Sequence, residues 1–455
     1  MTHLVNRLRF EIACSEEQEA FDVRQNLARV MQEIARDAID GVCSKYVAED
    51  ETIRIETIEL DLGRLSRHAI ERELPSVIAS RFEAALVEQL AGRERSPTRK
   101  TVRASRFELF LHVITTGTLP WWEPSEEVDL DAIVRDLAEN APAELRAFLY
   151  TAAGDRTMWR RIAYQLRDGS RQALVDLLPE LTKALADVEQ MLVPTPKERT
   201  DRDLRTLTLE ALLRAAPDIL AAPDDATVVT TVAREVIEGL ETSASVAGPA
   251  AVPLESRQPA RDPRVADTAG SANAVAPVES EVPPDRTPAS ERHVVRHAGL
   301  ILLAPFLERF FEICALRDRK QWIDKAAQYM AVHLLHYVCT GEEGRAEHAL
   351  TLEKVCCGIA LDEPIPRDLV LRAEQKTEAH DLLASVIEHW KALKNTSIDG
   401  LRATFLTRDG VLTRRGDDWV LRVERKTLDI LLDRIPWGYS TVAMPWNNYV
   451  IHVEW

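Results

Sequence analysis

The chain has 455 residues, of which 45% are hydrophobic and 29% charged, as in ordinary soluble globular proteins of two or three domains. Its formal net charge of −17 disfavours DNA, RNA and anionic membranes as main partners, since phosphate binding needs a concentrated positive patch. The N-terminus lacks a secretory pattern, and no run approaches the roughly 18 apolar residues of a membrane span.

The first part of the chain is predicted to be a small α+β head. Apolar and polar residues alternate over 4–13 and 51–62, which is typical of strands, and a change of parity predicts a bulge or bend near Thr57. Helical spacing of apolar residues predicts a helix after each strand, up to about residues 40 and 90. The order of elements is therefore β-α-β-α.

A loop and one more helix are expected to follow this head. Residues 94–104 are polar and basic and are predicted to form a solvated loop. Residues 106–115 are predicted to form a short apolar helix, which Gly117 ends because glycine tolerates the left-handed conformation. The paired Trp121 and Trp122 are expected to pack back on this helix. The predicted N-terminal domain is residues 1–122.

The middle of the chain is predicted to be helical and then extended. Residues 123–241 show leucines at helical spacing between Pro and Gly breaks, which indicates a variable helical region. No aromatic residue occurs between Tyr164 and Phe306, which disfavours a large rigid core in its second half. Residues 242–290 are rich in Pro and Ala and are predicted to be a flexible linker, since such a segment buries little apolar surface.

Residues 291–455 are predicted to form a C-terminal helical domain that ends in a β-hairpin and short strands. Its densest apolar run is residues 297–311, in which Pro305 is expected to start or kink a helix. Alternating residues around 411–413 and 419–423 predict the hairpin, and Tyr449–Trp455 a final strand. The expected helices are 297–315, 318–340, 346–357, 366–394 and 397–407, and residues 427–434 are expected to form a helical turn or two. The fold class of the whole chain is thus mainly α with small α+β parts.

The six cysteines show no paired CxxC spacing and are predicted to be free, small buried side chains. His333, His336 and Cys339, with Cys356 or Cys357, are ligand types for zinc. A buried helix with hydrogen-bonded imidazoles explains them better, because residues at i, i+3 and i+6 spread around the helix. We therefore predict no metal site and no cofactor. The Ser elbow, the phosphate loop and the dinucleotide-binding glycine motif are absent, so no enzyme activity is predicted.

Six segments of the C-terminal domain occur in a specific order: HAGLILLAPFL (297–307), AVHLLHYVCTG (331–341), LEKVCCGI (352–359), VIEHWKALKNTSIDGLRATFLTRDGVL (386–412), ILLDRIPWG (430–438) and MPWNNYVIHVEW (444–455). Together with IETIELDLGRL (55–65) and TTGTLPWW (115–122), they resemble the tape measure proteins of phage-tail-like contractile injection systems, the needle-and-sheath particles made by bacteria. The resemblance covers roughly residues 1–125 and 291–455.

The resemblance implies a non-enzymatic protein that assembles in the cytoplasm with the inner tube and baseplate and helps to set tube length. Retention in the particle and self-association in the tube lumen are left open. The motif residues that we take as structural or interaction candidates are Trp121, Trp122, Gly299, Leu302, Pro305, Phe306, His333, Gly341, Gly358, Trp390, Arg402, Phe405, Pro436, Trp437, Pro445, Trp446 and Trp455.

Three hypotheses for the function remain open. In the first hypothesis the chain is a ruler. Its extensible part would be residues 125–290, which would span about 250 Å as a helix. In the second it is an assembly chaperone or plug that binds tube and baseplate through its folded ends. A generic α-helical adaptor outside such particles is the third.

Overall fold

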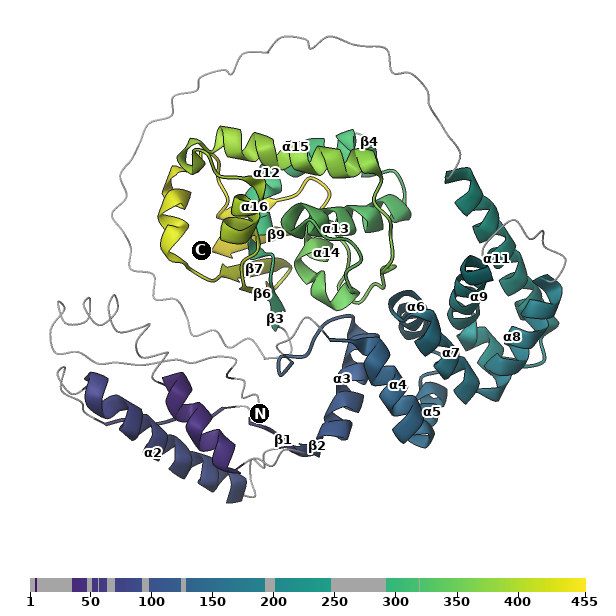
Figure 1. Cartoon of the computed structure of the whole chain (residues 1–455), viewed down its shortest axis with the longest axis horizontal. Coiled ribbons are helices and arrows are strands. Elements are labelled where there is room, and N and C mark those ends of the chain that lie inside the picture. The colour runs from purple at the N-terminus through teal and green to yellow at the C-terminus, as the bar shows by residue number, and fades with distance from the viewer. Residues whose placement is uncertain are drawn as a thin grey trace, which may run out of the picture.

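The computed structural model describes residues 5, 35–46, 51–55, 57–63, 70–91, 98–123, 128–192, 201–246, 292–318 and 320–455. These residues are mainly helical, with a small sheet near the C-terminus, which confirms the predicted fold class. Three separate hydrophobic cores define an N-terminal body (described residues of 35–101), a middle body (102–246) and a C-terminal body (292–455) (Figure 1). How the chain divides into domains remains a prediction.

The N-terminal body is a pair of helices. A helix at residues 35–46 packs on α2 (Ile70–Ala91), and both contribute apolar side chains to one small core. β1 (Glu51–Arg54) pairs antiparallel with β2 (Thr98–Thr101). β1 therefore covers only the first part of the predicted strand 51–62, and residues 57–63 pack beside the helices with no strand partner among the described residues. The prediction of a loop over 94–104 missed β2.

The rest of the predicted head lies outside the described residues. This applies to the strand over 4–13, apart from residue 5, and to the start of the helix that follows it.

The middle body is a stack of helices with one continuous core of Leu, Val, Ala and Ile side chains. Pro142 and Pro217 lie in the first turn of their helices and Pro179 begins another, as expected of residues that lack an N–H donor. Its helices are α3 (Val102–Thr116), α4 (Leu130–Asn140), α5 (Pro142–Thr151), α6 (Arg156–Gln165), α7 (Asp168–Leu177), α8 (Pro179–Leu192), α9 (Asp201–Arg214), α10 (Ala216–Ala221) and α11 (Ala226–Val246).

The expectation that the second half of this region lacks a large core is wrong. Leu212 and Leu213 of α9 are fully buried, and Val236 of α11 is 1% exposed. Aliphatic side chains of α8, α9 and α11 interdigitate there, so close packing is reached without an aromatic residue. The predicted linker 242–290 begins too early, because α11 continues to Val246; the remainder of that segment lies outside the described residues.

The C-terminal body begins with β3 (Arg292–Val295), which sequence analysis did not predict. The predicted helix 297–315 is two elements, a 3₁₀ segment η3 (Ala298–Leu303) and α12 (Ala304–Ile313), and Pro305 lies in the first turn of α12. Short strands β4 (Arg317–Asp318) and β5 (Gln321–Trp322) replace the expected start of the next helix.

The remaining helical elements of the C-terminal body lie within the predicted helices and the predicted helical turn at 427–434. They are α13 (Lys325–Thr340), η4 (Glu347–Ala349), α14 (Thr351–Cys356), α15 (Ala373–His389), η5 (Lys391–Leu393), α16 (Ile398–Leu401), a π-helical segment η6 (Arg402–Leu406) and η7 (Thr427–Arg434).

A five-stranded sheet of order β3-β6-β7-β9-β8 closes this body. The predicted hairpin is confirmed: β6 (Gly410–Arg415) and β7 (Asp418–Val423) pair antiparallel across a turn at Gly416. The predicted terminal strand is β9 (Val450–Glu454), which pairs parallel with β7 and antiparallel with β8 (Thr441–Ala443). η3, which lies in the first motif of the body, contacts β7 and so packs on the sheet to which the last motif contributes β9. β3 contacts α14.

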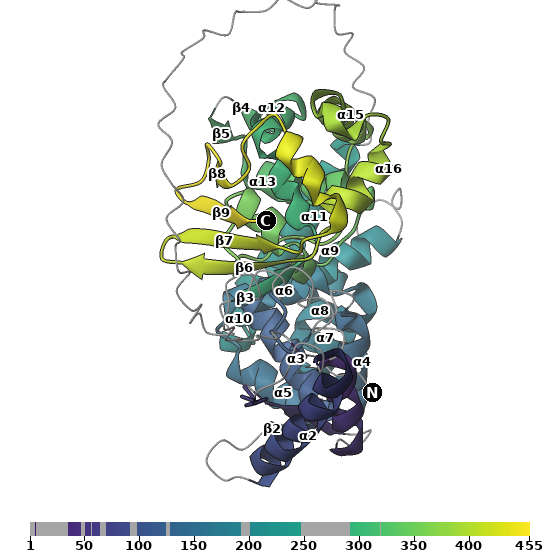
Figure 2. The same cartoon turned by 90° about the vertical axis from the view of Figure 1, so that its left-hand side faces the viewer.

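The C-terminal body rests on the middle body, and the N-terminal helices lie at the far end of the molecule (Figures 1 and 2). Five of the cysteines lie among the described residues, all as free thiols, and four of these are buried. No helix in the described part of the chain is both long and apolar enough to cross a membrane.

Candidate functional site

The middle and C-terminal bodies meet at a buried carboxylate, Glu347, in the 3₁₀ segment η4. Its Oε2 accepts a hydrogen bond from Arg161 Nε of α6 at 3.1 Å, and its Oε1 accepts one from Lys354 Nζ of α14 at 2.8 Å. None of the three side chains is more than 1% exposed. One carboxylate therefore holds two buried cations, one from each body.

Backbone carbonyls satisfy the other donors of the two cations. Arg161 Nη1 donates to Ile114 O and Thr115 O, and its Nη2 donates to Asp362 O of the C-terminal body. Lys354 Nζ donates to Leu361 O and Glu363 O, both at 2.7 Å. Separation of the two bodies would break these hydrogen bonds, so we infer that the network favours this docked arrangement.

A polar rim surrounds this network. Gln165 bridges the bodies twice: its Nε2 donates to Ile365 O at 2.7 Å, and its Oε1 accepts from the backbone N–H of Glu347 at 2.8 Å. Arg367 of the C-terminal body lies 3.5 Å from the carboxylate of Asp131 of α4. Gly117 packs directly against Glu347 and leaves no room for a side chain, because a Cβ at this residue would lie 2.5 Å from Glu347 Oε1.

The family-motif tryptophans connect segments of the C-terminal body that are far apart in sequence. Each indole Nε1 donates to a distant acceptor: Trp437 to Leu302 O at 2.9 Å, Trp446 to Cys356 O at 2.8 Å, and Trp390 to Leu431 O at 3.2 Å. The half-buried Trp455 donates to Asp429 Oδ2 at 3.0 Å. These indoles therefore join the first motifs of the body to the last.

The motif glycines lie where backbones approach closely. A Cβ on Gly299 would lie 1.7 Å from the carbonyl oxygen of Phe405, so no side chain fits there. Gly341 and Gly358 have positive φ values of 80° and 73°, as helix ends of this kind require. Arg402 covers the end of α13 at Gly341 and donates from Nε to Val338 O at 3.0 Å.

The other motif candidates have smaller contacts. The ring of Phe306 packs on Trp437 with centroids 5.0 Å apart, and that of Phe405 on Trp390 at 4.7 Å. Trp122 packs on the middle core, as predicted, and carries the guanidinium of Arg54 above its ring. Trp121 is half-buried, whereas Pro305, Pro436 and Pro445 are exposed.

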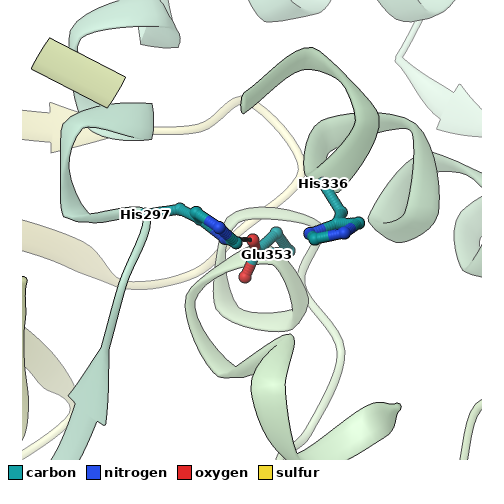
Figure 3. A group of neighbouring side chains, drawn as sticks. All are labelled: His297, His336 and Glu353. Carbon is teal, nitrogen blue, oxygen red and sulfur yellow. Dashed lines mark hydrogen bonds and ion pairs between the residues drawn. The ribbon is translucent and has the colours of Figure 1, made fainter. Parts of the chain in front are cut away.

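The histidines of α13 have separate partners. His333 Nε2 donates to Pro366 O at 2.7 Å. His336 lies instead with His297 and Glu353, and one possible ligand atom from each of these three buried side chains lies within 4.8 Å of the others (Figure 3). His297 Nδ1 and Glu353 Oε1 form an ion pair at 2.6 Å. In the described part of the chain, the set that sequence analysis weighed for zinc is therefore not the set brought together.

Electrostatics keep this cluster asymmetric. Burial lowers the pKa of the His336 imidazole to about 4, so this side chain is neutral near pH 7. Burial alone would raise the pKa of Glu353, but the charge and hydrogen bond of His297 outweigh it and hold that pKa below its ordinary value. The cluster therefore contains a hydrogen-bonded His297–Glu353 pair and one neutral imidazole, that of His336.

Sequence reasoning missed Arg161, Glu347, Lys354 and the pairing of His297 with Glu353. Arg161 is 186 residues from Glu347 and His297 is 56 residues from Glu353, so no local spacing relates these partners. Lys354 is seven residues from Glu347, and its pairing depends on how η4 and α14 pack. One signal was present: Glu353-Lys354 interrupts the otherwise apolar run LEKVCCGI. A charged pair inside such a run is typical of buried ionic partners.

A comparison with protein-family models found a match over residues 2–455 to the model described as contractile injection system tape measure protein. Comparisons with curated proteins and with solved structures found no match.

Proposed function

The chain belongs to the family of contractile injection system tape measure proteins, and on that basis we propose that it is a non-enzymatic assembly protein that links the inner tube to the baseplate and helps to set tube length. It would act in the cytoplasm while the particle is built. The observation that supports this role is the presence of folded bodies on both sides of residues 247–291, as expected of a protein that binds partners at two ends.

The fold narrows the part of the chain that is free to extend. Residues 128–192 and 201–246 belong to a packed core and cannot unwind into one long helix without losing that core. We therefore restrict the extensible segment of the ruler hypothesis to residues 247–291, in place of the whole of 125–290. Fully extended, these residues would span about 150 Å.

Use of this segment as a ruler requires the junction to open. The segment joins α11 of the middle body to β3 of the C-terminal body, and the Arg161–Glu347 network holds these two bodies together. Tension on the segment would have to separate a buried ion network. The free chain would thus be compact, and only the assembling tube would extend it.

This docking also favours a second candidate function, a compact assembly factor or plug. Such a protein keeps its bodies docked throughout, and its linker serves only as a tether. The burial of the network and its hydrogen bonds across both bodies support this alternative.

Stepwise deletions within 247–291 separate the two functions. The full gene is replaced by versions that lack increasing parts of this segment, and particle length and number are measured by electron microscopy. A ruler predicts particles shortened by up to about 3.5 Å per deleted residue. Deletions should not enter 201–246, since loss of α9–α11 would unfold the middle body. A scrambled segment of unchanged length is the matched control.

Unchanged length across the series, with normal particle numbers, would exclude the ruler and favour the compact assembly factor. The link to both partners has its own test: full-length tagged protein should copurify with inner tube and baseplate subunits from assembling cells. Recovery of neither subunit would contradict both functions.

A further inference from the structure

We propose that His297, His336 and Glu353 form a binding site for a divalent transition-metal ion of the zinc class inside the C-terminal body. The residues come from three elements: His297 immediately precedes η3, His336 lies on α13 and Glu353 lies on α14. Their side chains converge on one point in the core (Figure 3). They are 6%, 3% and 1% exposed, so solvent does not compete for the site.

The donor set selects the class of ion. Two imidazoles and one carboxylate are typical ligands of Zn²⁺ and of neighbouring ions such as Co²⁺ and Ni²⁺. Ca²⁺ and Mg²⁺ take oxygen ligands almost exclusively, and this site offers two nitrogens.

The geometry requires only a small adjustment. Bonds of about 2.0–2.1 Å to a tetrahedral ion place ligand atoms roughly 3.3 Å apart. The three ligand atoms lie within 4.8 Å of one another. The His297–Glu353 pair, at 2.6 Å, must open slightly, and His336 must approach. Rotation of side chains is sufficient for shifts of this size.

The ion would satisfy an atom that the rest of the fold leaves unsatisfied. Nδ1 of His336 is buried and has no hydrogen-bond partner among the described residues, while its Nε2 lies 3.4 Å from Thr340 Oγ1. An imidazole held by a second group on one nitrogen and free on the other is the usual arrangement of a metal ligand. A hydrogen-bonded pair alone accounts for His297 and Glu353, but not for the position of His336 beside them.

Binding requires the Nδ1 lone pair of His297 and the carboxylate of Glu353, so the ion would replace the hydrogen bond between these two atoms. His336 would contribute the ring nitrogen that lacks a hydrogen-bond partner among the described residues.

The experiment uses the purified full-length chain, stripped with a chelator and then titrated with Zn²⁺ or Co²⁺. Metal content after gel filtration, the absorption of bound Co²⁺ and the thermal unfolding midpoint are the readouts. The expected result is one ion per chain and a raised midpoint. His336→Gln and Glu353→Gln each remove a direct ligand and should weaken metal binding by at least about 100-fold. Loss of a group that only hydrogen-bonds to a ligand already weakens binding by up to about 100-fold.

His333→Gln is the matched control, since His333 is a buried histidine one turn away on the same helix whose ring bonds Pro366 O. It should keep the ion. Equal binding by the control and both cluster variants would assign the ion to exposed histidines and overturn the proposal. If the variants do not fold, the wild-type chain still decides: folded protein that retains no ion and shows no shift of its midpoint overturns the proposal.

Discussion

Arg161 of α6 and Glu347 of η4 are 186 residues apart in the chain and form a buried ion pair with 3.1 Å between Nε and Oε2. Lys354 lies on the other oxygen of the same carboxylate. This shared carboxylate joins the middle body to the C-terminal body, and it governs both the stability of the free chain and the ease with which its bodies separate.

Glu347→Gln should destabilise the chain by about 3–5 kcal/mol, because it leaves two buried cations without a counter-charge. Denaturant unfolding of the full-length protein measures this change. Glu424→Gln is the control, since Glu424 pairs with Lys426 at a site where both side chains are about half exposed; its cost should be below about 1 kcal/mol. Equal effects of the two changes would contradict a structural role for the network.

Gly117→Ala should cost at least about 2 kcal/mol, in part because a residue with a Cβ pays roughly 1–2 kcal/mol at a φ of 77°. The added methyl would also lie 2.5 Å from Glu347 Oε1 and displace the network. The free energy of unfolding is again the measurement. Gly154→Ala serves as the control, because a Cβ there meets no atom within 4 Å.

Gly299→Ala should destabilise the C-terminal body by about 1–3 kcal/mol or more, the cost of overpacking a close contact. Its Cβ would lie 1.7 Å from Phe405 O, so the backbone of η3 or η6 must move. Gly438→Ala, in open space in the same body, should have little effect. Thermal unfolding of the two variants would show the difference, and similar midpoints would argue against tight packing at Gly299.

Stability should fall as the pH drops from about 6.5 to about 4, by up to roughly 1.4 kcal/mol per pH unit for each buried histidine concerned. Burial lowers the pKa of His336 and His293 to about 4. The unfolded chain therefore binds more protons than the folded chain across this window. This loss of stability is complete below the pKa of the histidine in the folded chain and absent above its pKa in the unfolded chain.

Denaturant unfolding of chelator-treated protein at several pH values tests this dependence. His336 faces His297 and Glu353, so the slope is read as a difference between variants. His336→Gln should flatten the slope above about pH 4.5, where carboxylate titration contributes less. The exposed His380→Gln should leave it unchanged. A slope that His336→Gln does not alter would mean that His336 is protonated in the folded chain.

Local rules predicted many elements correctly. The hairpin around Gly416, the end of α13 at Gly341 and the start of α12 at Pro305 each follow from the conformation that one residue type allows. The errors occurred where neighbours in space decided the outcome. Residues 57–63 have a strand-like pattern but no partner strand among the described residues, and α9 and α11 contribute only aliphatic side chains to the middle core.

The sequence by itself determined the fold class, the C-terminal ends of several helices and the family, because turn chemistry, periodicity and ordered motifs are local properties of the chain. Only the tertiary structure decided that Arg161 meets Glu347 and that His297, His336 and Glu353 converge. A buried charge is tolerated only where packing supplies its partner, and here packing brings that partner from another part of the chain. No local pattern records such a pairing.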